Sequence, residues 1–133
     1  MVRLQSRDAS DAEISTFSAQ GEASLSELYA AYVAFLKSAP TRLTLVDLSS
    51  ARLPSIDFGS IRSLAMRVAQ IGRRRREGGR SAIVCAREPD FGLARVFVSL
   101  VSAERQPVCF AVFGGPNSAK VWLKGESGDS RCT

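Results

Sequence analysis

Three short apolar runs, each followed by a stretch with helical spacing, constrain the fold of this chain more than any other feature. The runs cover residues 43–48, 81–86 and 108–113. A strand that is apolar at nearly every position suits a sheet covered on both faces, as in parallel sheets with crossover helices. Strands that alternate with helices in this way predict an α/β fold with a parallel core.

The N-terminal third adds two further strands and a helix. Partial alternation of apolar and polar residues over 2–5 and 12–19 predicts an antiparallel hairpin, and Gly21 is expected to end it. Ser24 and Glu27 form a capping-box pattern, in which each side chain bonds to the backbone amide of the other residue. This pattern predicts the start of a helix that stops before Pro40.

Three more helices complete the predicted order. The second begins at about Asp57 and runs into four consecutive arginines, the third begins at residues 89–90, and a short fourth covers 118–124. The order is therefore ββαβαβαβα, which predicts a mixed five-stranded sheet with four helices. With 133 residues, no repeat and no linker, the chain is expected to form one domain over residues 1–124. Residues 125–133 form a polar tail that we expect to be disordered.

Composition excludes several classes of function. The chain has no histidine, which removes the commonest general base and the commonest transition-metal ligand. Cys85 and Cys109 lie in apolar runs and are expected to be small buried side chains, and no cysteine spacing fits a zinc site. We therefore expect no catalytic residue, no cofactor and no metal. No run approaches the ~18 apolar residues of a membrane span, and the N-terminus lacks a signal-peptide pattern, so a cytoplasmic location is expected.

Short motifs carry a resemblance to a known family. Val46-Asp47-Leu48, the segment IDFGSI at 56–61, and Leu64 resemble the core of the STAS domain, the fold of the bacterial anti-sigma-factor antagonist SpoIIAA. The segments DFGLARVF at 90–97 and AKVWL at 119–123 are similar to the SpoIIAA-like STAS/SEC14 subgroup. The resemblance implies a STAS fold over most of the chain and a non-catalytic regulatory module of bacterial type.

The turn before the second helix departs from the family pattern. Antagonists carry a phosphorylatable serine there, usually in the wording Asp-Ser-Ser-Gly, whereas this chain has Asp57, Phe58, Gly59 and Ser60. Gly59 thus occupies the phosphoserine position, so the resemblance does not imply the classical phosphorylation switch. Ser60 or Ser55 could serve as a phosphosite only with a shift of register. The competing interpretation is that both serines only cap the helix or stabilise the turn.

The carboxyl edge of the parallel strands is the candidate site for a partner or ligand, because ligands of open α/β sheets bind there. The residues predicted at this edge are Asp47, Ser55, Asp57, Phe58, Ser60, Asp90 and Phe91. Glu88 and Arg95 could extend a shallow site beside the third helix. The alternative is structural: the aspartates cap turns and helices, Phe91 packs, and Gly92 lets the helix approach the sheet.

A basic patch is formed by Arg73, Arg74, Arg75 and Arg76. Such a patch could contact nucleic acid or an anionic membrane surface through phosphates. No aromatic platform or nucleic-acid motif accompanies it, so nucleic acid is not the expected partner. The competing interpretation is a solvated helix end whose cations complement the helix dipole.

The leading functional hypothesis is a STAS-like module that binds a protein partner or a second copy of itself, through the sheet edge and the second helix. A first alternative is a small binder of an apolar or lipid-like ligand. It rests on the broad apolar face of the first helix, formed by Tyr29, Tyr32, Phe35 and Leu36. In SEC14-type relatives such a face covers a hydrophobic cavity, although this chain is too short to predict an enclosed lipid site. An enzyme of unknown type is the second alternative.

Overall fold

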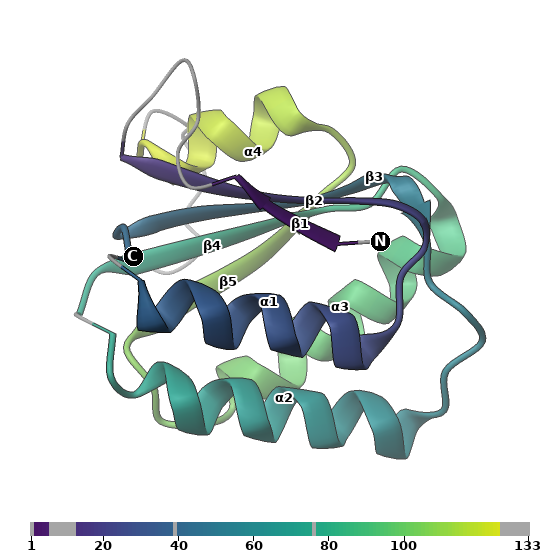
Figure 1. Cartoon of the computed structure of the whole chain (residues 1–133), viewed down its shortest axis with the longest axis horizontal. Helices are drawn as coiled ribbons and strands as arrows, with labels where there is room; N and C mark the ends of the chain where they lie inside the picture. Colours follow the sequence, from purple (N-terminus) through teal and green to yellow (C-terminus); the bar gives the residue numbers. More distant parts are fainter. Residues whose placement is uncertain (1, 6–12, 39, 76, 126–133) are drawn as a thin grey trace.

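The computed structural model describes residues 2–5, 13–38, 40–75 and 77–125. This part of the chain contains five strands and four helices in the predicted order ββαβαβαβα (Figure 1). The strands are β1 (Val2–Gln5), β2 (Ile14–Glu22), β3 (Leu43–Arg52), β4 (Gly79–Val84) and β5 (Val108–Phe113). The helices are α1 (Leu25–Lys37), α2 (Phe58–Gly72), α3 (Glu88–Ser102) and α4 (Pro116–Leu123).

The strands form one sheet in the order of the sequence, β1-β2-β3-β4-β5. Strands β2 to β5 are parallel, and β1 pairs with β2 in the antiparallel direction. The mixed sheet therefore agrees with the prediction of an N-terminal antiparallel pair beside a parallel core.

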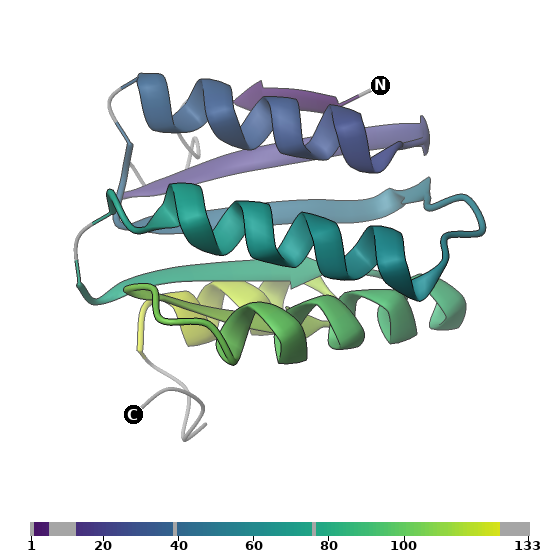
Figure 2. The same ribbon diagram turned by 90° about the horizontal axis from the view of Figure 1, so that it is seen from below.

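Helices cover the two faces of the sheet unequally. Helices α1, α2 and α3 lie side by side across one face, and α4 lies on the other (Figures 1 and 2). Each of the first three helices connects two neighbouring parallel strands. None of the helices in the described residues is long and apolar enough to cross a membrane.

The hydrophobic core is divided by the sheet into two clusters, because successive side chains of a strand point to opposite faces. On β4, Ile83 belongs to the cluster under α1, α2 and α3, whereas Ala82 and Val84 belong to the cluster under α4. Trp122 of α4 is fully buried in this second cluster. Arg80 helps to hold Trp122 in place, because its guanidinium carbon lies over the Trp122 ring, 5.0 Å from the ring centre, and its Nη1 donates to the Trp122 carbonyl at 2.7 Å.

Three predictions about local structure were wrong. Gly21 does not end β2: it lies inside the strand with a φ of +68°, just after a register shift between Ser18 and Gln20. A glycine tolerates this left-handed conformation, which lets β2 continue past the irregularity. Helix α2 ends at Gly72, before the arginines rather than within them. Gly92 does not allow a close approach of α3 to the sheet, since a methyl group there would meet no atom within 4 Å.

Candidate functional site

A polar groove of about 550 Å³ lies between the N-terminal ends of α1 and α2 and includes the turn before α2. Its lining is dominated by serines and by the backbone of the turn. The lining residues are Ser24, Leu25, Ser26, Tyr29, Pro54, Ser55, Ile56, Asp57, Gly59, Ser60, Ser63, Leu64 and Arg67.

Both helix ends at the groove are capped by side chains. The Ser24 hydroxyl accepts from the Glu27 amide at 3.1 Å, and the Glu27 carboxylate accepts from the Ser24 amide at 3.2 Å, which confirms the predicted capping box. Asp57 caps α2 by accepting from the Ser60 amide at 2.7 Å. This bond and a second one from the Ser60 side chain lower the pKa of the exposed Asp57 carboxyl. Asp57 is therefore ionised and engaged at neutral pH.

An arginine and a tyrosine close the side of the groove. The guanidinium carbon of Arg67, on α2, lies 4.4 Å from the centre of the Tyr29 ring, on α1. Such a cation–π contact contributes about 0.5–1 kcal/mol at an exposed site. Arg67 and Tyr29 therefore hold α1 and α2 together where both helices line the groove.

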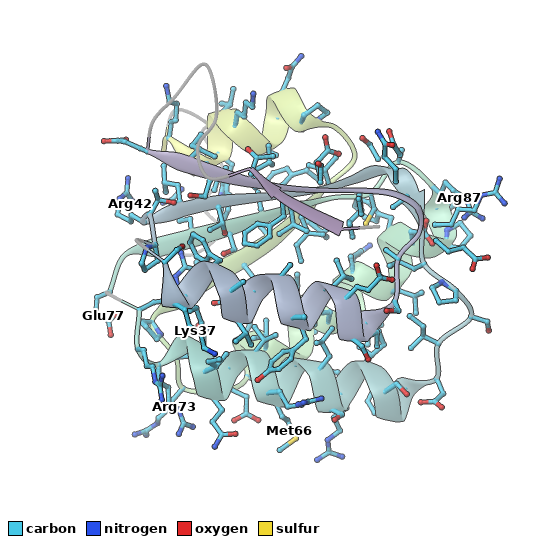
Figure 3. The ribbon with its side chains drawn as sticks, viewed as in Figure 1. Lys37, Arg42, Met66, Arg73, Glu77 and Arg87 are labelled. Atoms are coloured by element: carbon cyan, nitrogen blue, oxygen red, sulfur yellow. The ribbon has the colours of Figure 1, made fainter. Side chains whose placement is uncertain are left out.

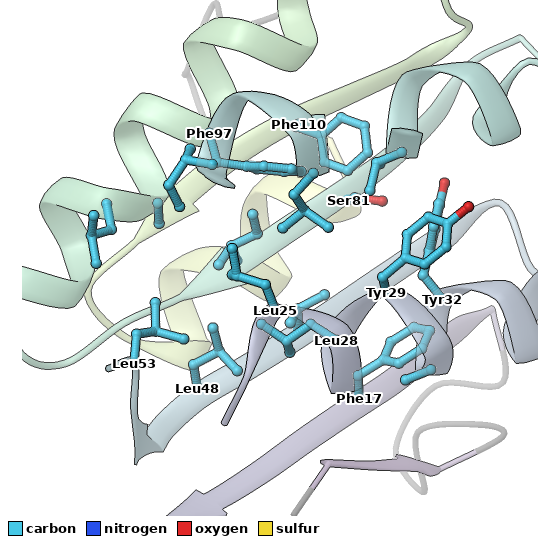
Figure 4. Close-up of a pocket in the computed structure, with 18 of the residues that line it drawn as sticks. Phe17, Leu25, Leu28, Tyr29, Tyr32, Leu48, Leu53, Ser81, Phe97 and Phe110 are labelled. Atoms are coloured by element: carbon cyan, nitrogen blue, oxygen red, sulfur yellow. The ribbon is translucent and has the colours of Figure 1, made fainter. Parts of the chain in front are cut away.

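An apolar cavity of about 110 Å³ lies behind the groove, between the sheet and helices α1, α2 and α3 (Figure 4). Leu25, Tyr29 and Leu64 line both the groove and the cavity, so the two spaces adjoin. The other residues around the cavity are Phe17, Leu28, Ala31, Tyr32, Thr44, Val46, Leu48, Leu53, Ile61, Val68, Ser81, Ile83, Leu93, Ala94, Phe97 and Phe110. Nearly all of them are apolar, as is usual for a site that takes a small organic molecule.

Three residues around the cavity carry hydroxyl groups, Tyr32 on α1, Thr44 on β3 and Ser81 on β4, but the surface that faces the cavity is almost entirely apolar. Thr44 and Ser81 lie opposite each other on neighbouring strands, and their hydroxyls share a very short hydrogen bond. Nη1 of Arg75 donates to the Ser81 hydroxyl at 3.1 Å and to the Tyr32 hydroxyl at 3.4 Å. A buried cation thus lies directly behind two of the polar groups that line the cavity.

The structure places the residues predicted at the sheet edge in two separate regions. Ser55, Asp57 and Ser60 line the groove, and Phe58 is exposed on α2 beside it. Asp47 and Asp90 lie instead near Cys85, whose pKa is raised to about 12 by burial first and then by these two carboxylates. The seven predicted residues therefore do not form one continuous site.

The predicted residues near Cys85 make contacts that stabilise the fold. Asp47 accepts from the Ser49 amide at 3.0 Å and from the Ser49 hydroxyl at 2.6 Å, so it stabilises β3 where its register with β2 shifts. Asp90 was expected to cap α3, but it is buried and pairs with Arg87 at 3.6 Å, and α3 has no side-chain cap. Phe91 packs against the core as predicted.

The predicted basic patch also needs correction. Arg75 is 8% exposed and faces inward, so it does not belong to a surface patch. Its Nη2 donates to the carbonyls of Thr41 and Arg42 at 3.3 and 3.1 Å, which explains why the chain turns it toward the strands. Arg73 and Arg74 are exposed, and Nε of Arg73 donates to the Arg105 carbonyl at 3.2 Å. Arg76 lies outside the described residues.

Sequence reasoning did not find the cavity or the inward direction of Arg75. The apolar face of α1 was the one available signal, and two of its members, Tyr29 and Tyr32, do line the cavity. Phe35, by contrast, is fully packed between Phe17 and Tyr32. Within the described residues, no three histidine, cysteine or acidic side chains come close enough to hold a metal ion.

Comparisons with known proteins identify the fold. No family model and no curated protein matches the sequence. Among solved structures, the chain is similar to an uncharacterized protein of the DUF3478 family with a SpoIIAA-like fold, from Shewanella loihica PV-4. The two chains are 19% identical, the match covers 92% of each, and the TM-score is 0.53. The protein thus has a SpoIIAA-like fold, the fold that its short STAS-like motifs predicted.

Proposed function

We propose that the chain is a non-catalytic, cytoplasmic regulatory module of the STAS type that binds a protein partner. The contact region is the outer side of α2, which we call the α2 surface and define by Phe58, Arg62, Met66, Arg67, Arg73 and Arg74. The observation that carries the proposal is the exposure of its two large apolar side chains. Phe58 is 59% exposed and Met66 is 50% exposed, and Met66 points away from the fold (Figure 3). Exposed apolar groups gathered on one surface often mark a site of protein association.

Charge specifies the kind of partner. The α2 surface carries four exposed arginines, Arg62, Arg67, Arg73 and Arg74, and residues 58–76 contain no aspartate or glutamate. A partner that matches the α2 surface therefore has an apolar centre with acidic residues around it, because complementary charge directs association and suppresses wrong partners. A second copy of this chain is a weaker fit, since two α2 surfaces would bring like charges together.

The ionisable groups of the groove support a role without catalysis. The Asp57 carboxylate already accepts hydrogen bonds from Ser60, and its lowered pKa makes it a weak base at neutral pH. The Arg67 guanidinium lies over the Tyr29 ring. Both groups therefore have a structural role, Asp57 as a helix cap and Arg67 in a contact between two helices.

Phosphorylation of Ser60 remains a weaker part of the proposal. Ser60 is exposed in the first turn of α2, where free amides and the helix dipole favour a phosphate. Its side chain, however, lies within hydrogen-bonding range of the Asp57 carboxylate. A phosphate there would repel Asp57 and weaken the cap, so modification would alter the end of α2 rather than only add charge.

The partner hypothesis can be tested by affinity capture with matched variants. We would immobilise the wild-type protein, the Phe58→Ser/Met66→Ser variant, and a control with Val96→Ser and Val121→Ser, which alters exposed apolar residues on α3 and α4. Quantitative mass spectrometry would compare the proteins that each one retains. We expect a partner with an acidic surface that the wild type and the control retain and the α2 variant loses at least about tenfold. Equal retention by all three would contradict the proposal, and light scattering of the wild type would show whether it self-associates.

The apolar cavity favours a second candidate function, the binding of a small apolar ligand. Its volume of about 110 Å³ is below the ~300 Å³ of the smallest typical drug-sized pockets, so a whole lipid does not fit. It is comparable with the engineered cavity of about 150 Å³ that binds benzene in another protein. The candidate ligand is therefore a molecule with a short hydrocarbon body.

This candidate is tested by filling the cavity. Ala94 lines it from α3, and Ala94→Leu would occupy part of the space. Benzene binding, followed by NMR shifts of the methyl groups that line the cavity, should be detectable in the wild type and weakened at least about tenfold in Ala94→Leu. The control is Ala103→Leu, an exposed position after the end of α3. An absence of binding in the wild type, or an equal loss in the control, would argue against a ligand cavity.

A further inference from the structure

We propose that the protein also binds the phosphate backbone of double-stranded nucleic acid, without reading its sequence, through a cluster of cations at one end of the fold. This basic end consists of five exposed side chains, Lys37, Arg42, Arg73, Arg74 and Arg105. The sequence did not favour nucleic acid because only the run of arginines at 73–76 was considered. The fold adds three cations from other segments, and the function differs from the capture of a protein by the α2 surface.

The topology of the sheet brings these cations together. Helices α1, α2 and α3 each connect two neighbouring parallel strands, so all three run in the same direction and finish at the end of the sheet where β3, β4 and β5 begin. Lys37 is the last residue of α1, Arg73 and Arg74 follow α2, and Arg105 follows α3, whereas Arg42 precedes β3. Figure 3 shows Lys37, Arg42 and Arg73 at the same end of the fold.

The contacts of these cations leave their charge unneutralised. Nε of Arg73 donates to the Arg105 carbonyl at 3.2 Å, and Nη1 of Arg42 donates to the Gly78 carbonyl at 3.1 Å. Both acceptors are neutral, and within the described residues none of the five cations forms an ion pair. Cations that follow a helix also complement its dipole, but Arg42 lies in no helix and Arg105 lies beyond the end of α3. The dipoles therefore do not account for the whole cluster.

Charge is segregated between the two ends of the molecule. The loops that carry the basic end contain two acidic residues, Glu77 and Glu104. At the opposite end, where the parallel strands finish and the helices begin, the acidic residues outnumber Arg52 and Arg87. They are Glu22, Glu27, Asp47, Asp57, Glu88 and Asp90. Such a distribution turns the basic end toward a polyanion and raises the rate of association.

The basic end lacks the apolar groups that a protein or a membrane would contact. Among the described residues, the exposed large hydrophobic side chains are Phe58, Met66, Val96 and Val121, and none of them lies in the segments 37–42, 73–79 and 103–107 that form this end. Protein interfaces have an apolar core. Stable attachment to a membrane needs an apolar anchor in addition to a polybasic patch. A phosphate backbone requires only cations, so it is the polyanion that fits best.

A duplex fits the basic end better than a single strand. Proteins bind single strands by stacking the bases on aromatic side chains, and the segments 37–42, 73–79 and 103–107 contain no aromatic residue. Neighbouring helices pack about 8–10 Å apart, so a surface across the ends of three helices is about 16–20 Å wide. This width reaches phosphates on both sides of a groove about 12 Å wide. The basic end therefore complements the backbone of a duplex and offers nothing that reads its bases.

Fluorescence anisotropy with a labelled DNA duplex of 20 base pairs and mixed sequence tests the proposal. The wild type should bind at 50 mM salt and lose about 100-fold or more in affinity at 200 mM salt, because about four to five phosphate contacts release counterions. Arg42→Gln/Arg105→Gln removes two cations of the basic end that do not belong to the α2 surface. It should weaken binding at 50 mM salt at least about tenfold and reduce the salt slope by about two.

The matched control is Arg52→Gln/Arg95→Gln, which removes the same charge from exposed positions outside the basic end. It should keep the salt slope of the wild type. Phe58→Ser/Met66→Ser should also bind the duplex normally, so a loss of the protein partner and a loss of duplex binding are distinguishable.

Four outcomes would overturn the proposal. They are no duplex binding by the wild type at 50 mM salt, equal losses in the two arginine double variants, tighter binding of oligo-dT of the same length, and binding only to vesicles that contain phosphatidylserine. The first, third and fourth are measured on the wild type, so the test stays decisive even if a variant does not fold.

Discussion

Arg67 of α2 covers the ring of Tyr29 of α1, with 4.4 Å between the guanidinium carbon and the ring centre. This pair lies at the boundary between the polar groove and the apolar cavity, because Tyr29 lines both spaces and Arg67 lines the groove. The contact therefore holds α1 and α2 together at the boundary of the two spaces.

Removal of the Arg67 guanidinium should weaken this interface modestly. We expect Arg67→Gln to lower the free energy of unfolding by about 0.5–1 kcal/mol, the value of an exposed cation–π contact. Arg62→Gln is the control, because Arg62 is an exposed arginine of the same helix and a surface change there should stay within about ±0.5 kcal/mol. Urea denaturation followed by circular dichroism would measure both, and equal effects would show that the ring contact does not contribute.

The cap of α2 should depend on pH. Hydrogen bonds from Ser60 lower the pKa of Asp57 in the folded protein, so the ionised carboxylate stabilises the fold above its unfolded pKa of about 3.9. That contribution is lost as the pH falls through the lower, folded pKa. Asn caps helices about as well as Asp without titrating, so Asp57→Asn should unfold with less dependence on acid than the wild type. Denaturation midpoints measured from pH 6 to pH 2 would show the difference, and parallel curves would contradict it.

Trp122 should be the most costly side chain to remove from the face covered by α4. It is fully buried against the sheet face that α4 covers, so Trp122→Ala should destabilise the protein by about 3–5 kcal/mol. Its ring nitrogen is buried without a hydrogen-bond partner in the described residues. Trp122→Phe removes this unpaired group, and we expect it to cost clearly less than Trp122→Ala. Circular dichroism is the suitable probe, because both changes remove the chain's only tryptophan.

Cys85 should resist alkylation in the folded protein. Its thiol is buried, and burial together with Asp90 and Asp47 raises its pKa to about 12. At pH 8 only about one thiol in ten thousand would be a thiolate, the form that reacts. Iodoacetamide should therefore label the peptide with Cys85 slowly in buffer and rapidly in 6 M guanidinium chloride. Mass spectrometry of the digested protein would follow both rates, and fast labelling of the native chain would show that this region opens.

The strands could be predicted because their signal is local. Residues 43–48, 81–86 and 108–113 are apolar on both faces, and the sheet does bury both faces of β3, β4 and β5. The caps at Ser24 and Asp57 were also predictable, since each depends on residues within three positions in the sequence. The end of β2 could not be predicted, because a glycine such as Gly21 usually indicates the end of a strand, whereas here pairing with β3 keeps it within the strand.

The cavity and the burial of Arg75 could not be predicted, because both depend on residues that are far apart in the sequence. In the sequence Arg75 is one of four consecutive arginines, and nothing distinguishes it from its neighbours. Its burial depends on the end of α2 at Gly72 and on acceptors from residues 32, 41, 42 and 81. The empty volume likewise depends on how three helices pack on the sheet, which no local pattern encodes. The extent of the domain over residues 1–124 remains a prediction.

The unequal covering of the sheet has a consequence for biosynthesis. One face of β3, β4 and β5 is covered by α4, a helix that follows all three strands in the sequence. While the chain leaves the ribosome, α1, α2 and α3 can cover their face as each strand pair forms, but the opposite face has to wait for α4. The nascent chain therefore carries an apolar sheet surface that a chaperone can recognise until α4 has been made.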